Sequence, residues 1–128
     1  MPFQVVAAVA LGGACGAVAR YFVVSQIGHW AGTGFPFGTL AVNVAGSFAM
    51  GLIVELSALA WLPSPELRAF LTVGFLGAFT TFSAFSLDAA LLYERGELLP
   101  AAAYVAGSVV LSVGAFFAAL ALVRALLA

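Results

Sequence analysis

Four long apolar stretches, separated by short segments rich in polar residues or proline, dominate the sequence. A helix needs about 20 mostly apolar residues to cross the hydrocarbon core of a bilayer, and each stretch reaches that length. Four spans leave little of a 128-residue chain for anything but short loops. The sequence therefore predicts an all-α membrane protein that forms a single transmembrane domain over residues 1–128. The predicted helices cover residues 3–24, 37–61, 67–93 and 98–128.

The predicted helix ends lie at short segments that disfavour a continued apolar helix. We expect the first helix to end at residues 25–29, the second at residues 63–65 and the third at residues 94–97. Residues 1–4 lack the positive charge of a signal peptide, so we expect the first helix to remain in the mature protein. Amphipathic aromatic rings, which prefer the headgroup level, lie near the predicted ends: Trp30, Trp61 and Tyr93.

The small number of charged residues excludes several classes of function. Only 7% of the residues are charged, against about 25% in a soluble domain, and the basic residues are arginines alone. At a net charge of −1 the chain has no basic surface for nucleic acid. A single cysteine, Cys15, excludes a disulfide framework within the chain and a thiolate metal cage, and His29 has no second histidine with which to share a metal.

No arrangement of side chains indicates catalysis, so we do not expect an enzyme. The sequence contains no acid–base pair with a plausible spacing, no nucleophile with a base and no metal motif. The acids within the apolar spans are Glu55 and Asp88. Each lies toward one end of its helix, where we expect it to reach the membrane interface.

The four arginines are divided evenly between the two sides of the membrane. Both termini and the second loop share one side, with Arg68 and Arg124, whereas the first and third loops share the other, with Arg20 and Arg95. An excess of basic residues normally marks the cytoplasmic side. The even division indicates insertion in both orientations. The alternative is that the amino terminus or a flanking interaction decides the orientation.

Pairs of small residues four positions apart predict close helix contacts. Gly12 and Gly16 form one pair on the first span, and Ser47 and Gly51 form another on the second. Four helices also enclose little space for a pathway. These two observations favour a homo-oligomer, most simply a dimer.

Asn43 is the first of three polar features inside the predicted spans. It shares a helix face with Gly46, Ser47 and Gly51 through spacings of three and four residues. Its amide carries two N–H donors, which suit an anion that has lost its water. The alternative is an interhelical hydrogen bond that stabilises the fold.

The second feature is a row of hydroxyl groups on the fourth span. Tyr104, Ser108 and Ser112 are spaced by four residues and therefore lie in one stripe. Hydroxyl groups donate or accept hydrogen bonds as needed, so such a row can pass along a small hydrated ion. The alternative is ordinary hydrogen bonding between helices.

The third feature is the stretch of residues 74–86, whose glycines, threonines and serines make a poor continuous helix. A break there exposes backbone groups that are tolerated at membrane depth only within protein or beside water. The freed carbonyl oxygens are hard ligands suited to an alkali cation. Phenylalanine edges carry partial positive charge and can support an anion. The alternative is that the rings pack as apolar side chains: Phe75, Phe79, Phe82 and Phe85.

The sequence contains GGACGAVARY at residues 12–21, GTLAVN at residues 38–43 and GFLGAFTTFS at residues 74–83. Together these motifs resemble the CrcB/Fluc family of fluoride channels. The similarity covers essentially the whole chain, in order and at the expected length. The combination of TTFS at residues 80–83 with the motif of Asn43 is highly specific for this family among four-span proteins.

The resemblance implies an antiparallel, dual-topology homodimer in the cell membrane that passes fluoride out of the cell and prevents its toxic accumulation. It implies a third helix broken in mid-membrane, two fluoride pathways at the subunit interface, and one central sodium ion (Na⁺) held by the backbone carbonyls of Gly77 and Thr80. The implied pathway combines an amide, aromatic rings, hydroxyl groups and an arginine that attracts anions at the vestibule: Asn43, Phe82, Phe85, Tyr104, Ser108, Ser112, Thr81 and Arg20.

Three residues depart from the family pattern. Ala78 replaces a frequent glycine, Ala84 replaces a frequent threonine, and Phe79 is bulkier than the usual aliphatic residue. We expect Ala78 to stiffen the break slightly. A cation site built from carbonyl groups needs no side chain there, so we expect the site to be retained.

Two other classes of membrane protein remain as alternatives. A proton-coupled exporter that resembles the small multidrug transporters requires an acid within the first helix, and residues 3–24 contain none. In a non-conducting membrane subunit, Asn43 and the hydroxyl row only stabilise the fold. Ion flux distinguishes the three classes, because a channel conducts passively, a transporter needs a coupled gradient and a subunit does neither.

Overall fold

The computed structural model describes residues 1–127 and is helical throughout apart from short connections. Four helices or helical units are long and apolar enough to cross a membrane, which confirms the predicted all-α architecture with four spans. The third unit consists of four consecutive segments. The elements are α1 (Phe3–Ala31), α2 (Phe37–Leu59), α3 (Pro65–Ala69), the π-helix η1 (Phe70–Leu76), α4 (Gly77–Phe79), α5 (Phe82–Glu94) and α6 (Leu98–Leu127).

The first helix is longer than predicted. It continues through the polar residues 25–29 and ends at Ala31, where Gly32 adopts a φ of 80° and donates its N–H to the carbonyl of Gly28. Polar side chains at a membrane surface do not interrupt helical hydrogen bonds, whereas a glycine with positive φ does. The expected end at residue 24 was therefore wrong.

The other helix ends lie within two residues of the predictions, and the starts at residues 37 and 98 agree with them. Helix α2 ends at Leu59, because the N–H groups of Ala60 and Trp61 both bond to the carbonyl of Leu56. Helix α3 begins at Pro65, with the Ser64 hydroxyl accepting a hydrogen bond from the N–H of Leu67 at 3.1 Å. Proline at the first position of a helix loses no hydrogen bond. The predicted end of the last helix at residue 128 lies outside the described residues.

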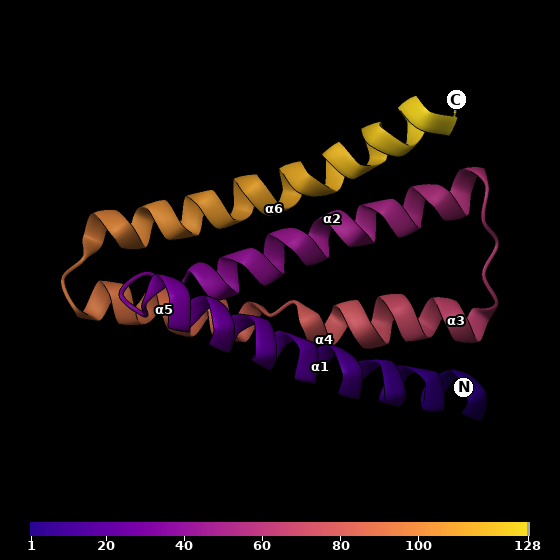
Figure 1. Cartoon of the computed structure of the whole chain (residues 1–128), viewed down its shortest axis with the longest axis horizontal. Coiled ribbons are helices and arrows are strands. Elements are labelled where there is room, and N and C mark those ends of the chain that lie inside the picture. Colours follow the sequence, from indigo (N-terminus) through magenta and orange to yellow (C-terminus); the bar gives the residue numbers. More distant parts are fainter. Residues whose placement is uncertain (128) are drawn as a thin grey trace.

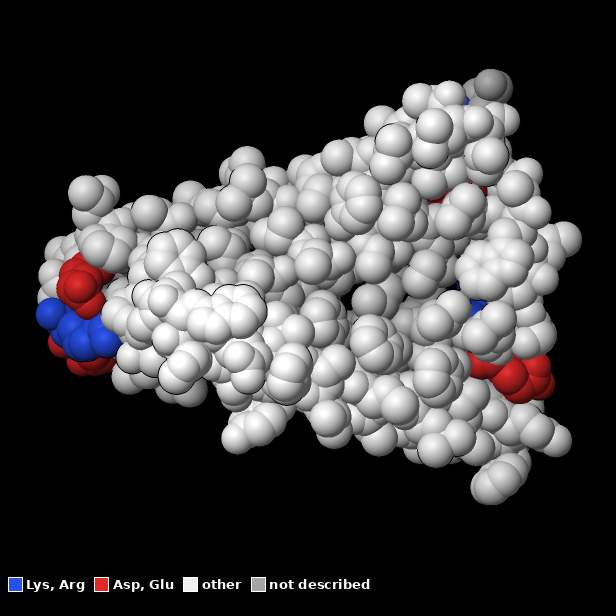
Figure 2. Space-filling model, viewed as in Figure 1, with Lys and Arg blue, Asp and Glu red and all other residues white. Residues whose placement is uncertain are grey.

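The helices run along one axis, with the two termini and the α2–α3 connection at the same end (Figure 1). The α1–α2 and α5–α6 connections lie at the opposite end. Helix α6 packs along α2, and α1 packs along η1 and α4. On the face seen in Figure 2, charged side chains are confined to the two ends, with an uncharged surface between them, as a membrane span requires.

Small residues allow the helix backbones to approach closely. A Cβ atom at Gly12 or Gly16 would overlap the carbonyl oxygen of Phe70 or Phe75, respectively, and one at Gly51 would lie 2.6 Å from the carbonyl oxygen of Phe116. The close contacts predicted for these glycines are therefore formed within one chain. They consequently give no support for a dimer.

Candidate functional site

The third span is interrupted at two threonines, between α4 and α5. Thr80 (φ −91°, ψ 158°) and Thr81 (φ −153°, ψ 125°) have extended backbones. The N–H and hydroxyl groups of Thr80 both donate to the carbonyl of Leu76, at 3.0 and 2.9 Å. The hydroxyl of Thr81 accepts the N–H of Ala84 at 3.1 Å and so caps the start of α5. One threonine thus ends the first half of the span and the other begins the second half.

Asn43 of α2 bonds to the interruption through both ends of its amide. Its Oδ1 accepts the N–H of Thr81 at 2.7 Å, and its Nδ2 donates to the carbonyl of Thr81 at 3.1 Å. The interhelical hydrogen bond that was one of the two interpretations of Asn43 is therefore present. Because an amide has two N–H groups, one donor remains for another partner. The two interpretations are compatible.

Arg20 of α1 reaches the same region from another direction. Its Nε donates to the carbonyl of Ala78 at 3.0 Å, although the two residues are 58 positions apart in sequence. Arg20 is half-buried and lies within the span rather than in a loop. Arg68 and Arg124 lie toward the end that holds the termini, and Arg95 lies toward the opposite end. Arg20 belongs to the half of α1 that leads to the first loop, so the even division of the four arginines stays a prediction.

A pocket of about 320 Å³ lies between the interruption, α2 and α6. It brings together six of the eight residues predicted for the fluoride pathway, namely Asn43, Thr81, Phe82, Phe85, Ser108 and Ser112. Tyr104 and Arg20 do not line it. Two of the remaining lining residues were expected elsewhere in the site: Ser47 on the helix face of Asn43, and Thr80 as a sodium ligand. The sequence did not single out the other two, Val109 and Val113.

The hydroxyl of Ser108 is a fully buried polar group of this pocket that lacks a hydrogen-bond partner within the described residues. Ser108 is only 6% exposed, and within residues 1–127 its Oγ has no hydrogen-bond partner. Buried hydroxyl groups are normally hydrogen-bonded, because burial without a partner costs free energy. An unpartnered donor at the wall of a pocket is therefore available to a ligand.

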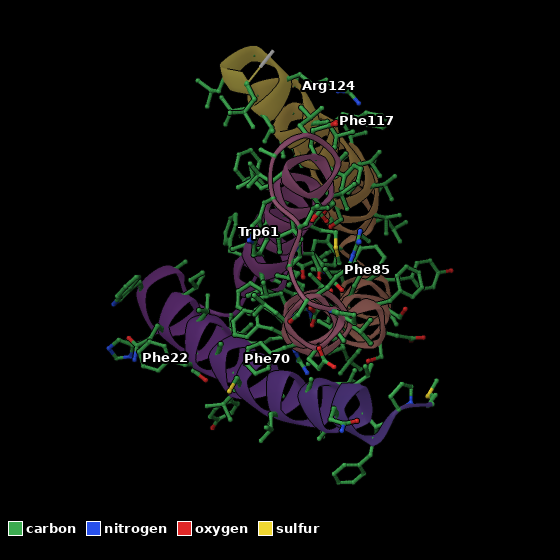
Figure 3. The ribbon with its side chains drawn as sticks, turned by 90° about the vertical axis from the view of Figure 1, so that its right-hand side faces the viewer. Phe22, Trp61, Phe70, Phe85, Phe117 and Arg124 are labelled. Atoms are coloured by element: carbon green, nitrogen blue, oxygen red, sulfur yellow. The ribbon has the colours of Figure 1, made fainter. Side chains whose placement is uncertain are left out.

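The two phenylalanines of the pocket differ in environment. Phe82 is 78% exposed, whereas Phe85 is 9% exposed and lies 5.1 Å, between ring centroids, from Tyr104. The two phenylalanine rings are 5.4 Å apart. Figure 3 shows Phe85 in the middle of the molecule among the helices, in contrast to Phe22 at the edge of α1. Phe85 is therefore both a pocket residue and a core residue, whereas Phe82 is free to contact a ligand.

The two acids of the apolar spans, Asp88 and Glu55, have partners within the chain. The Tyr104 hydroxyl donates to Oδ2 of Asp88 at 3.2 Å, which ties the hydroxyl row of α6 to α5. Glu55, 8% exposed, forms an ion pair with Arg124 at 2.8 Å. The expectation that both acids reach outward to the interface omitted these contacts. Neither contact has a signature in sequence spacing, because the partners lie on different helices.

The carbonyl oxygens of Gly77 and Thr80 accept no hydrogen bond from the described residues. The N–H of Thr81, which a continued helix would direct to Gly77, is bonded to Asn43 instead. Both residues line a smaller pocket of about 190 Å³, together with residues of α2 and α6 such as Met50 and Phe116. The interruption thus leaves two unpartnered carbonyl groups in residues that line the same smaller pocket.

Comparisons with known proteins agree on one family. Residues 7–120 match the family model described as "CrcB-like protein, Camphor Resistance (CrcB)". The chain is 61% identical to the "Fluoride-specific ion channel FluC" of Rhodospirillum centenum, over 94% of this chain and 96% of that protein. Identity is 52% to the protein of the same name from Nitrobacter winogradskyi (97% and 98% covered) and 56% to that of Rhizobium etli (92% and 94% covered).

Proposed function

The chain belongs to the CrcB-like family, and we propose that it is a fluoride-selective channel that releases fluoride passively across the cell membrane and so limits its toxicity. As a multi-pass membrane protein with four spans, it has the architecture that such a pathway needs. The observation that carries the proposal within the structure is the unpartnered, buried hydroxyl of Ser108 at the wall of the larger pocket.

The pocket offers donors suited to a small anion that has lost its water. Fluoride is strongly hydrated, so a pathway must replace its water with well-placed hydrogen-bond donors. The free N–H of Asn43 and the hydroxyl groups of Ser108 and Ser112 can donate. Thr81 and the ring edges of Phe82 and Phe85 complete the polar and weakly positive lining. Tyr104, with its hydroxyl bonded to Asp88, continues the hydroxyl row beyond the pocket.

The assembly that we propose is an antiparallel, dual-topology homodimer with two pathways at its interface. One chain leaves the pocket open beside exposed apolar residues: Phe82 is 78% exposed, and Val109 and Val113 are also largely exposed. A second copy would cover these side chains and close the wall. The nearly balanced arginines at the two ends are consistent with insertion in both directions.

We also propose a structural sodium ion at the centre of this dimer. The unpartnered carbonyl oxygens of Gly77 and Thr80 are hard neutral ligands, so the residues present fit an alkali cation. Two carbonyl oxygens are few ligands for a dehydrated cation. A second copy related by a two-fold axis would bring the number to four. When bound, the ion neutralises dipoles that would otherwise lie unpaired at membrane depth. The chain's own contribution is to hold these carbonyls in place through the hydrogen bonds of Thr80 and Thr81.

Fluoride efflux from liposomes containing the purified protein tests this function. We expect passive fluoride release, measured with a fluoride electrode, that does not require a proton gradient and excludes chloride. Release only under an imposed proton gradient would indicate the coupled exporter. No release from liposomes that hold the folded protein would indicate a non-conducting subunit.

A further inference from the structure

One face of α1 fits against the first half of the third span at backbone distance. Gly12, Gly16 and Arg20 are spaced by four residues and therefore share this face. A Cβ atom at Gly12 or Gly16 would overlap a carbonyl oxygen of η1. From the other side, a Cβ atom at Gly74 would lie 2.8 Å from the carbonyl oxygen of Val9. The two backbones thus touch, which fixes the height and rotation of α1 beside η1 and α4 (Figure 1).

Arg20 uses this fixed position to bond to the end of α4. The carbonyl of Ala78 lies where the helix stops, so it has no following helical N–H to accept. The Arg20 Nε supplies the missing donor at 3.0 Å. A cation is also favourable beside the carbonyl end of a helix. The hydrogen bond therefore satisfies an otherwise orphaned backbone group inside the span.

A second contact holds the opposite side of the interruption. Asn43 of α2 exchanges two hydrogen bonds with Thr81, three residues beyond Ala78. Thr80, which lines both pockets, lies between the two contacts. The short extended segment is thus held by α1 at one end and by α2 at the other.

We propose that Arg20 is a positioning residue: by capping Ala78 from α1, it fixes the backbone of residues 77–81 and so the pocket wall that this segment forms. The proposal deepens the proposed function, because that function makes this wall part of the pathway. It differs from the anion attraction that the family resemblance implies for the same arginine. Attraction depends on the charge of Arg20 at a distance, whereas capping depends on one short hydrogen bond.

The two roles differ in their dependence on salt. Attraction of an anion by a partly exposed charge weakens as the Debye length falls from about 30 Å at 0.01 M salt to about 3 Å at 1 M. A partly buried hydrogen bond to a backbone carbonyl is screened much less. The flux lost on removing Arg20 should therefore be independent of salt if the residue positions the wall, and should shrink at high salt if it attracts fluoride.

The first test compares Arg20→Gln with Arg68→Gln, a matched loss of an exposed arginine on α3. Hydrogen exchange by mass spectrometry reports the backbone, and fluoride efflux reports the pathway. In Arg20→Gln we expect the peptides that cover residues 77–83 to exchange about tenfold faster, with the other spans unchanged. We expect efflux to fall about tenfold, by the same factor at low and high potassium salt with sodium held constant. Arg68→Gln should match the parent in both measurements.

The second test moves α1 without altering Arg20. A methyl group at Gly16 meets the backbone of Phe75, whereas the nearest atom to a methyl group at Gly13 lies 3.9 Å away. We expect Gly16→Ala to reproduce the local exchange of Arg20→Gln, and Gly13→Ala to behave as the parent. This pair gives an answer even if Arg20→Gln fails to fold.

Unchanged exchange at residues 77–83 in Arg20→Gln would overturn the proposal, as would unchanged exchange in Gly16→Ala should Arg20→Gln fail to fold. So would a loss of efflux in Arg20→Gln that disappears at high salt, because attraction would then explain the effect. If the parent protein carries no fluoride, the proposed function fails, and the exchange data still decide whether Arg20 holds the segment.

Discussion

The side-chain amide of Asn43 pairs with the backbone of Thr81 much as two backbone groups pair in a sheet, with hydrogen bonds of 2.7 and 3.1 Å. The pair satisfies the N–H and carbonyl groups of an extended residue inside a membrane span, where water cannot do so. It also engages the Thr81 N–H, which in a continuous helix would bond to the carbonyl of Gly77. One side chain therefore stabilises the interruption, frees a carbonyl and retains a donor for the pocket.

Replacing Asn43 should consequently affect both stability and flux. In Asn43→Ser the serine side chain is too short to reach both the N–H and the carbonyl of Thr81. Leaving these groups unpaired should lower the free energy of unfolding by about 1–3 kcal/mol. Asn43→Asp can accept the Thr81 N–H but offers no donor and repels an anion. We expect both variants to lower fluoride efflux at least about tenfold. Thermal unfolding and efflux measured on the same preparations check this, and parental flux in Asn43→Asp would show that the amide donor is not used.

Phe82 and Phe85 should give separable effects, because their burial differs. Isoleucine at either position keeps apolar bulk and removes the positive ring edge, so each change should slow fluoride efflux about tenfold or more. Only Phe85→Ile should also destabilise the protein, by about 1–2 kcal/mol, since that ring packs in the core against Tyr104. Phe75→Ile should cost much less flux, and chloride should remain excluded in all three variants. Parental conduction in both Phe82→Ile and Phe85→Ile would contradict the role of the ring edges.

A cation site made of backbone should survive loss of the threonine side chain. Thr80→Ala removes the hydrogen bond from Oγ1 to the carbonyl of Leu76, which should lower the unfolding free energy by about 1 kcal/mol. The carbonyl of Thr80 remains, so we expect efflux to keep its dependence on sodium. An arginine or lysine placed beside the carbonyls should abolish that dependence by like-charge repulsion. A parent protein whose efflux and stability are indifferent to sodium would exclude the site.

Orientation in the membrane is tested by labelling. A tag at the carboxyl terminus should be accessible from both sides of the membrane in comparable amounts if the chain inserts in both directions. Adding two or three lysines to the loop between α5 and α6 should bias insertion and lower efflux, since an antiparallel dimer needs both orientations. A tag found on one side only would exclude the antiparallel assembly.

The sequence predicts the number of spans well, because apolar length alone decides whether a helix can cross a bilayer. It also places Asn43, Ser108 and Ser112 on defined helix faces, since spacing determines facing. The sequence does not reveal which helix faces pack against each other. The contact of Gly16 with Phe75 required the packing of α1 on η1, and the predicted close contacts proved to be within one chain.

The polar contacts of the site were harder to predict than the fold. Arg20 with Ala78 and Tyr104 with Asp88 join residues 58 and 16 positions apart, and their distances depend on how the helices cross. The ion pair of Glu55 with Arg124 is of the same kind. Sequence spacing identifies residues that share an element, whereas these pairs join different elements, so only the folded structure shows them.

Ser108 provides the sharpest test, because stability and function should change in opposite directions. Its hydroxyl is buried without a partner, so Ser108→Ala should leave stability unchanged or raise it slightly. If the hydroxyl donates to fluoride, the same change should reduce efflux by about tenfold or more, the effect of one hydrogen bond to an ion.

Ser57 supplies a matched control on α2. Its hydroxyl is likewise buried without a partner in the described chain, but it does not line the larger pocket. Ser57→Ala should therefore leave both unfolding temperature and efflux close to those of the parent. Equal efflux in Ser108→Ala and Ser57→Ala would show that the Ser108 hydroxyl takes no part in conduction. A loss confined to Ser108→Ala, at undiminished stability, is the result expected if the hydroxyl contacts the permeating ion or its water.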